Sequence, residues 1–171
     1  MTERKGLITV NGGPLTLLGN ELKVGDRAPN AILASNDLKP VELNSYRGKV
    51  VVISAVPSLD TPTCDIETRT FNKKATSLGK DVVILTISMD LPFAQKRWCG
   101  ASGVNNVVTL SDYKDASFGS AYGVLIKELH LLTRSIFVLD REGTIRYTQL
   151  VKEISKEPDY DAVYKAVEAL K

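Results

Sequence analysis

Two long runs of apolar residues and one shorter run dominate the hydropathy pattern of this chain. Residues 50–56 and 81–88 are apolar at most positions and rich in valine and isoleucine, and residues 106–110 form the shorter run. Unbroken β-branched runs of this kind are typical of strands that are covered on both faces. The pattern therefore predicts three central strands of a buried sheet.

Between these runs the apolar residues follow a helical spacing. A helix is expected over residues 63–78, where Cys64 and Phe71 lie close to two helical turns apart on one inward stripe. Two more helices are expected over residues 91–98 and 158–170. Cys64 is thus predicted to lie near a helix N-terminus, facing the core.

Alternating and turn-rich segments complete the prediction. A β-hairpin is expected at residues 7–18, closed by the turn at 11–13, and a second hairpin at residues 134–150. Residues 41–43 are expected to form an edge strand, and residues 114–123 an irregular or briefly helical segment.

The order of these elements predicts an α/β sandwich with a mixed central sheet flanked by helices. Residues 1–171 are expected to form a single domain, with residues 1–20 as an N-terminal β-hairpin extension. At this length a chain buries a substantial core without disulfide bridges.

Composition restricts the classes of function. The net charge of +2 and the scattered basic residues argue against binding to nucleic acid or to a membrane. No apolar run approaches membrane-spanning length, and the first residues lack the apolar core of a signal peptide, so a cytoplasmic location is expected. The only histidine, His130, and two cysteines give no zinc-binding spacing, so no metal is expected.

Cys64 is the strongest candidate for chemistry. The N–H groups and dipole of a helix N-terminus favour the thiolate, which is the nucleophilic form of cysteine. Thr61 can place a hydroxyl beside the sulfur, although a threonine before a helix is also a common N-cap. Pro57 and Pro62 restrict the backbone around the thiol. Together these residues suit a site that binds and attacks a peroxide.

Cys99 is the only cysteine that could trap an oxidised Cys64 within the chain. Attack on a peroxide leaves a sulfenic acid, which condenses readily with a second thiol. Cys99 is expected near the end of the 91–98 helical segment, on a different helix from Cys64 and just before the glycine-bearing stretch 100–103, which can move. The alternative for Cys99 is a buried small hydrophobic residue.

The chain resembles the thiol peroxidase subfamily of the peroxiredoxins, which are atypical two-cysteine enzymes with a thioredoxin-like fold. The family signature of a proline, a threonine or serine, and a cysteine is met by Pro57, Thr61 and Cys64. Longer blocks carry the subfamily resemblance: residues 58–69, 90–100, 131–140 and 157–161.

The resemblance implies a role for each matching residue. Cys64 would attack the peroxide, Cys99 would resolve it as a Cys64–Cys99 disulfide, and Pro57, Thr61 and Arg134 would complete the substrate site. It also implies hydrogen peroxide and alkyl hydroperoxides as substrates, thioredoxin as the reductant, a homodimer, and no cofactor. Without the resemblance, Arg134 is expected to form a partly exposed ion pair.

Two other functions share some of these features. The chain could be a peroxide-sensing redox relay that passes oxidation from Cys64 to a partner protein, or a thioredoxin-fold interaction module with inert thiols. A general disulfide oxidoreductase is disfavoured because the chain has no Cys-x-x-Cys pair.

Overall fold

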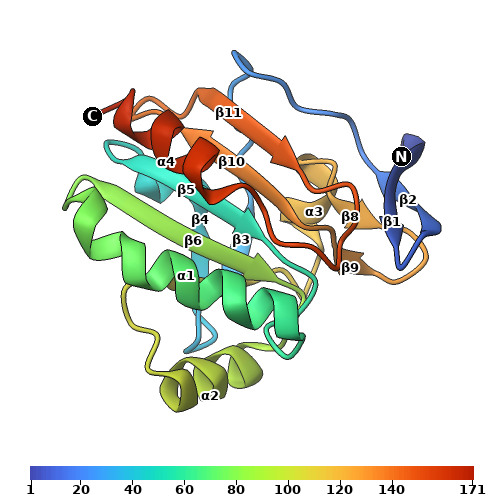
Figure 1. The fold of residues 1–171 in the computed structure, drawn as a ribbon, viewed down its shortest axis with the longest axis horizontal. Coiled ribbons are helices and arrows are strands. Elements are labelled where there is room, and N and C mark those ends of the chain that lie inside the picture. Colours follow the sequence, from blue (N-terminus) through green and yellow to red (C-terminus); the bar gives the residue numbers. More distant parts are fainter.

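The computed structural model describes residues 1–171 and contains two β-sheets, four α-helices and one 3-10 helix (Figure 1). The strands are β1 (Glu3–Val10), β2 (Gly13–Leu18), β3 (Ile32–Ala34), β4 (Pro40–Glu42), β5 (Val50–Ala55), β6 (Val82–Ser88), β7 (Val108–Ser111), β8 (Leu125–Ile126), β9 (Leu131–Leu132), β10 (Ser135–Leu139) and β11 (Ile145–Leu150). The helices are α1 (Pro62–Leu78), α2 (Pro92–Ser102), α3 (Ser117–Ala121), α4 (Tyr160–Glu168) and the 3-10 helix η1 (Leu43–Tyr46). None of the helices combines the length and apolar character needed to cross a bilayer.

The central sheet has seven strands in the order β11-β10-β5-β6-β7-β3-β4. Strands β5, β6 and β7 pair in parallel through the crossover helices α1 and α2, whereas β10, β11, β3 and β4 are antiparallel to their neighbours. The predicted mixed sheet flanked by helices is therefore confirmed. The three apolar runs form its parallel centre, where crossover helices cover the sheet.

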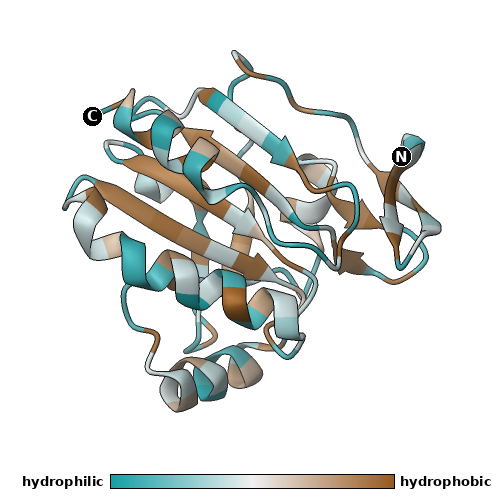
Figure 2. Ribbon diagram, in the orientation of Figure 1, coloured by the Kyte–Doolittle hydropathy of each residue, from teal (hydrophilic) through white to brown (hydrophobic).

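Strand β5 shows why its sequence is apolar at nearly every position. Val50 and Val52 pack against Phe71 in the core beneath α1 and α4, while Val51 and Ile53 point into a second core on the opposite face. Figure 2 shows the same contrast in colour, with brown, hydrophobic residues along β5 and β6 and mixed teal and white residues along the edge strand β11. A strand that is buried on both faces has no polar alternation.

The N-terminal hairpin belongs to a second, four-stranded sheet with the order β1-β2-β8-β9. The predicted hairpin is confirmed, whereas its partner strands in residues 124–133 have no counterpart among the predicted elements. Strands β8 and β9 have two residues each, too few to produce a periodic pattern. The hairpin therefore packs beside the main sheet (Figure 1) and forms a small core of its own with Ile126 and Ile154.

Helix α2 extends further than predicted. The expected end at residue 98 is wrong, because the helix continues through Gly100 to Ser102. It ends where Gly103 adopts a left-handed conformation, with a φ of 65°, and donates its N–H to the carbonyl of Cys99. Cys99 consequently lies inside the last turn of a helix, and its backbone is less free to move than the sequence suggested.

Candidate active site around Cys64

Cys64 lies in the first turn of α1, just after the chain leaves β5. Thr61 is the N-cap residue in an extended conformation, and Pro62 begins the helix, where its missing N–H costs nothing. The thiol is completely buried, with 0% of its surface exposed. First-turn N–H groups lack partners within their helix and favour negative charge nearby. The predicted location of Cys64, facing inward at a helix N-terminus, is confirmed.

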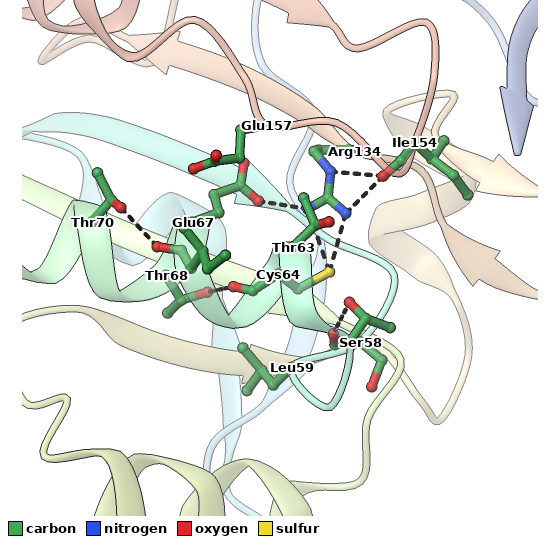
Figure 3. A network of polar contacts seen from close by, with 12 residues as sticks. Ser58, Leu59, Thr63, Cys64, Glu67, Thr68, Thr70, Arg134, Ile154 and Glu157 are labelled. Atoms are coloured by element: carbon green, nitrogen blue, oxygen red, sulfur yellow. Dashed lines mark hydrogen bonds and ion pairs between the residues drawn. The ribbon is translucent and has the colours of Figure 1, made fainter. Parts of the chain in front are cut away.

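The sheet register brings Arg134 to Cys64. Ser135, the first residue of β10, pairs with Ala55, the last residue of β5, so Arg134 lies beside the start of the segment that leads to α1. Two nitrogens of its guanidinium, Nη1 and Nη2, each lie 3.3 Å from the Cys64 Sγ. Figure 3 shows the sulfur pointing toward this group. A cation with two N–H donors aimed at a sulfur stabilises the thiolate more than the thiol.

Every side of the Arg134 guanidinium has an acceptor. Its Nε and Nη2 donate to the carbonyl of Ile154 at 3.0 and 2.8 Å, and its Nη1 lies 2.9 Å from Oε2 of Glu67. Burial opposes the charge, but Glu67 and Cys64 outweigh it, so the pKa of Arg134 is raised and the group stays positive. Arg134 thus forms the ion pair with an acidic residue that is expected from its strand position, but the expected partial exposure is wrong, because Arg134 is only 1% exposed.

Glu67 is part of this site and was missed by sequence reasoning. It lies one turn after Cys64 on the same buried face of α1, and burial raises its pKa to about 7 although Arg134 acts in the opposite direction. Its second oxygen, Oε1, has no hydrogen-bond partner. The available signal was an acidic residue on the inward stripe of a helix, where an unpaired charge is not tolerated.

The turn before α1 is fixed by Asp90, which follows β6. Its carboxylate accepts hydrogen bonds from the Ser58 hydroxyl at 2.6 Å and from the Leu59 N–H at 2.8 Å. The Thr61 hydroxyl donates to the Ser58 carbonyl at 2.9 Å and accepts from no N–H of α1, so it does not cap the helix. Its oxygen therefore keeps lone pairs that can accept a further hydrogen bond. Pro57 is buried at the start of this turn.

The structure does not bring Cys99 to Cys64. Cys99 lies on α2 and is partly buried, with its Sγ 3.5 Å from the Thr109 hydroxyl of β7, and both cysteines are free thiols. It lines a surface hollow of about 370 Å³ together with Asn36 and Tyr46. The two sulfurs thus point toward different neighbours in the reduced protein.

A polar contact nevertheless joins the residues next to the two cysteines. Trp98 donates its indole N–H to Oδ1 of Asp65 at 3.0 Å. Arg69 pairs with Asp65 at 3.0 Å, lies 5.7 Å from the centre of the Trp98 ring, and donates to the Ser102 hydroxyl at 2.9 Å. These four residues, called the α1–α2 contact below, attach the end of α2 to the first turns of α1.

No group of three or more histidine, cysteine, aspartate or glutamate side chains is arranged so that it could hold a metal ion. The polar groups of the site instead converge on one sulfur atom. Such a site can ionise a thiol and orient a small polar molecule in front of it.

Comparison with known proteins gives consistent matches over almost the whole chain. The family described as Redoxin matches residues 23–164. A thiol peroxidase from Bacillus subtilis is 53% identical over 163 residues, which cover 95% of this chain and 97% of that protein. A thiol peroxidase from Streptococcus pneumoniae is 48% identical over 164 residues, covering 96% of this chain and all of that protein.

Solved structures agree with the fold. A peroxiredoxin-like protein from Aquifex aeolicus superimposes with a TM-score of 0.91 at 42% identity, covering 98% of this chain and 99% of that one. A thiol peroxidase from Chromobacterium violaceum gives a TM-score of 0.85 over 95% of both chains. At 19% identity, this second likeness shows the fold alone.

Proposed function

Because this chain belongs to the thiol peroxidase subfamily of the peroxiredoxins, within the redoxin family, we propose that it reduces peroxides at Cys64. The observation that carries the proposal is the pair of guanidinium nitrogens of Arg134, each 3.3 Å from the Cys64 sulfur. A buried thiol gains reactivity from a fixed cation of this kind, whereas an inert core cysteine needs none.

In the first step the thiolate of Cys64 attacks one oxygen of the peroxide. A sulfur–oxygen bond forms as the oxygen–oxygen bond breaks, and the leaving oxygen takes up a proton and departs as water or an alcohol. The sulfur is oxidised to a sulfenic acid and the peroxide is reduced. The proton that the Cys64 thiol loses on ionisation balances the proton that the leaving oxygen takes up. Overall, one thiol and one hydroperoxide give one sulfenic acid and one molecule of water or alcohol.

Three residues orient this reaction. All five N–H donors of Arg134 are engaged, two of them by the sulfur, and one of these two can turn to the attacked oxygen as the peroxide enters. Positive charge then faces the electrons that move during attack. Thr61 accepts a hydrogen bond from the peroxide O–H, since its own proton is engaged by Ser58. Pro57 shields the sulfur from water. Complete burial of Cys64 favours hydrogen peroxide and small alkyl hydroperoxides as substrates.

In the second step Cys99 resolves the sulfenic acid. Its sulfur attacks the sulfur of Cys64, a disulfide forms and water leaves. A disulfide requires Cα atoms within about 7 Å, and the two thiols contact different neighbours in the reduced protein, so part of α2 must leave its position. The α1–α2 contact has to break for this movement.

A dithiol protein of the thioredoxin type then reduces the Cys64–Cys99 disulfide and is itself oxidised to a disulfide. This step restores both thiols and makes the cycle catalytic, which suits an antioxidant protein in the cytoplasm. A homodimer is expected from the subfamily, and sedimentation velocity at micromolar concentration would detect it.

The proposed cycle is tested by following peroxide consumption with thioredoxin, thioredoxin reductase and NADPH. Cys64→Ser is expected to abolish consumption. Cys99→Ser is expected to consume one equivalent of peroxide and then stop. Steady turnover by Cys64→Ser would contradict the proposal, and a mixed disulfide between Cys64 and another protein would favour the redox relay.

A further inference from the structure

The N-terminal hairpin contacts the loop that holds Arg134. This loop, residues 151–159, lies between β11 and α4. The carbonyl of its Ile154 accepts two hydrogen bonds from the Arg134 guanidinium, at 3.0 and 2.8 Å. The carbonyl is the acceptor on the side of the guanidinium away from Glu67, so its position fixes how Arg134 faces the sulfur (Figure 3). The placement of Ile154 therefore bears directly on the reactive centre.

Ile154 is held by the hairpin on two sides. Its buried side chain packs with Ile8, Leu15 and Leu17 of the hairpin in a small apolar core. Its N–H donates to the carbonyl of Thr9 at 2.9 Å, and the N–H of Thr9 donates to the carbonyl of Lys152 at 2.7 Å. The loop thus runs beside β1 as a short parallel pairing.

Glu153 adds a cluster of hydrogen bonds at the tip of the hairpin. Its carboxylate accepts from the Thr9 hydroxyl at 2.9 Å, from the N–H groups of Asn11 and Gly12 at 3.1 and 2.9 Å, and from the N–H and hydroxyl of Ser155 at 3.0 and 2.7 Å. Asn11 and Gly12 have φ angles of 48° and 81°, the left-handed conformation of a tight hairpin turn, which lets both N–H groups reach one carboxylate.

The same loop also contacts the start of α1. The carbonyl of Ser155 accepts a hydrogen bond from the Thr63 hydroxyl at 2.8 Å, one residue before Cys64. The loop therefore contacts both partners of the reactive pair, Arg134 on one side and the cysteine-bearing helix turn on the other. A shift of the loop would change the distance between the guanidinium and the sulfur.

We propose that the N-terminal hairpin, acting through Glu153 and the Ile154 carbonyl, positions Arg134 for the reaction of Cys64. Glu153 acts as a positioning residue, because it touches neither the sulfur nor the guanidinium. The inference rests on the proposed peroxidase function for its effect on peroxide, but its effect on the Cys64 thiol does not depend on that function.

The test compares Glu153→Ala with Glu128→Ala. Glu128 is a matched control because its carboxylate also accepts an N–H of the hairpin, that of Thr16 at 2.9 Å, but it does not contact the 151–159 loop. Both variants are prepared with Cys99→Ser, and three quantities are measured: the rate of Cys64 oxidation by hydrogen peroxide, the pH midpoint of Cys64 alkylation, and the melting temperature.

Glu153→Ala is expected to slow oxidation about tenfold, since a displaced donor loses much of its effect on an attacking group. It should also move the alkylation midpoint to higher pH, because a displaced Arg134 stabilises the thiolate less. Glu128→Ala should leave the oxidation rate within about twofold of wild type and the alkylation midpoint unchanged, at a comparable loss of melting temperature. Glu153→Gln keeps one acceptor oxygen and is expected to recover most of the rate.

If Glu153→Ala lowers the melting temperature but keeps the wild-type rate of Cys64 oxidation and the wild-type alkylation midpoint, the inference is overturned. If Glu153→Ala does not fold, Thr9→Val removes a single hydroxyl contact and should slow oxidation two- to threefold, and an unchanged rate would again overturn the inference. If wild-type Cys64 does not react with peroxide, the proposed function fails, and the alkylation midpoint still decides whether the hairpin positions Arg134.

Discussion

The α1–α2 contact should control how fast Cys99 resolves the oxidised Cys64. Trp98→Phe removes the indole N–H that Asp65 accepts and weakens the packing of Arg69 over the ring. Asp65 keeps Arg69 and solvent as partners, because its side chain is 32% exposed, so the substitution leaves no unpaired buried charge. The variant should therefore fold, with α2 less firmly attached to α1.

The size of the effect follows from the two interactions that the substitution removes or weakens. A hydrogen bond to a charged acceptor contributes about 1.5–3 kcal/mol when buried, and partial exposure brings this one toward about 1 kcal/mol. A surface cation–π interaction contributes about 0.5–1 kcal/mol, part of which phenylalanine retains. If α2 opens before the sulfurs meet, a decrease of about 1–2 kcal/mol in the free energy of opening raises the open population roughly 5- to 30-fold.

The assay mixes reduced protein with hydrogen peroxide, stops the reaction by acid and alkylation, and measures the Cys64–Cys99 disulfide by mass spectrometry. Trp98→Phe should form the disulfide roughly 5- to 30-fold faster and accumulate less sulfinic acid at high peroxide, because resolution then competes better with a second oxidation. Phe93→Leu is the control, since Phe93 is 64% exposed on the same helix. An unchanged rate of disulfide formation in Trp98→Phe would show that the α1–α2 contact does not limit resolution.

Substitutions at Glu67 and at Thr61 test two further residues of the site. The folded state raises the pKa of Glu67 from 4.5 to about 7, so its favourable contribution is complete below the lower value and is lost as pH rises through the higher one. In wild type the free energy of unfolding should therefore fall by as much as ~3 kcal/mol over this pH range, and in Glu67→Gln, measured by urea unfolding, this fall should be absent. Parallel pH profiles of the two free energies of unfolding would contradict this. Thr61→Val should slow peroxide attack about 100-fold while Thr61→Ser stays near wild type. Alkylation of Cys64 should change little in either, and equal loss in both reactions would indicate a structural role.

Local sequence patterns were enough to find Cys64, Thr61 and the main elements of the fold. The cysteine follows a buried strand and begins an amphipathic helix, and both features are read within about twenty residues. The structure agrees, because β5 is buried along its whole length and Phe71 of α1 packs in the core on one of its faces.

Local sequence patterns do not predict contacts between residues that are far apart in the sequence. Arg134 meets Cys64 only because Ser135 pairs with Ala55, and a sheet register is set by packing over the whole domain. The burial of Glu67 could have been predicted, since it lies on the inward face of a helix that the sequence pattern identifies. The contact of Glu153 with the hairpin joins residues more than a hundred positions apart, and no periodicity indicates it.

The position of Cys99 shows where helix propensity is overridden by packing. Gly100 suggests a helix end, because glycine inside a helix costs about 1 kcal/mol relative to alanine. Packing of Trp98 against the core and the polar link to α1 keep the helix intact past Gly100. For the proposed resolution by Cys99, we therefore expect the last turn of α2 to unwind.

Whether Cys64 and Cys99 form one redox pair is decided by peptide mapping after reaction with one equivalent of hydrogen peroxide. We expect a chain lighter by two hydrogens, with the peptides of Cys64 and Cys99 joined by a disulfide within one chain. An unmodified Cys64 after the peroxide has been consumed, or a disulfide that joins two chains, would contradict the pairing.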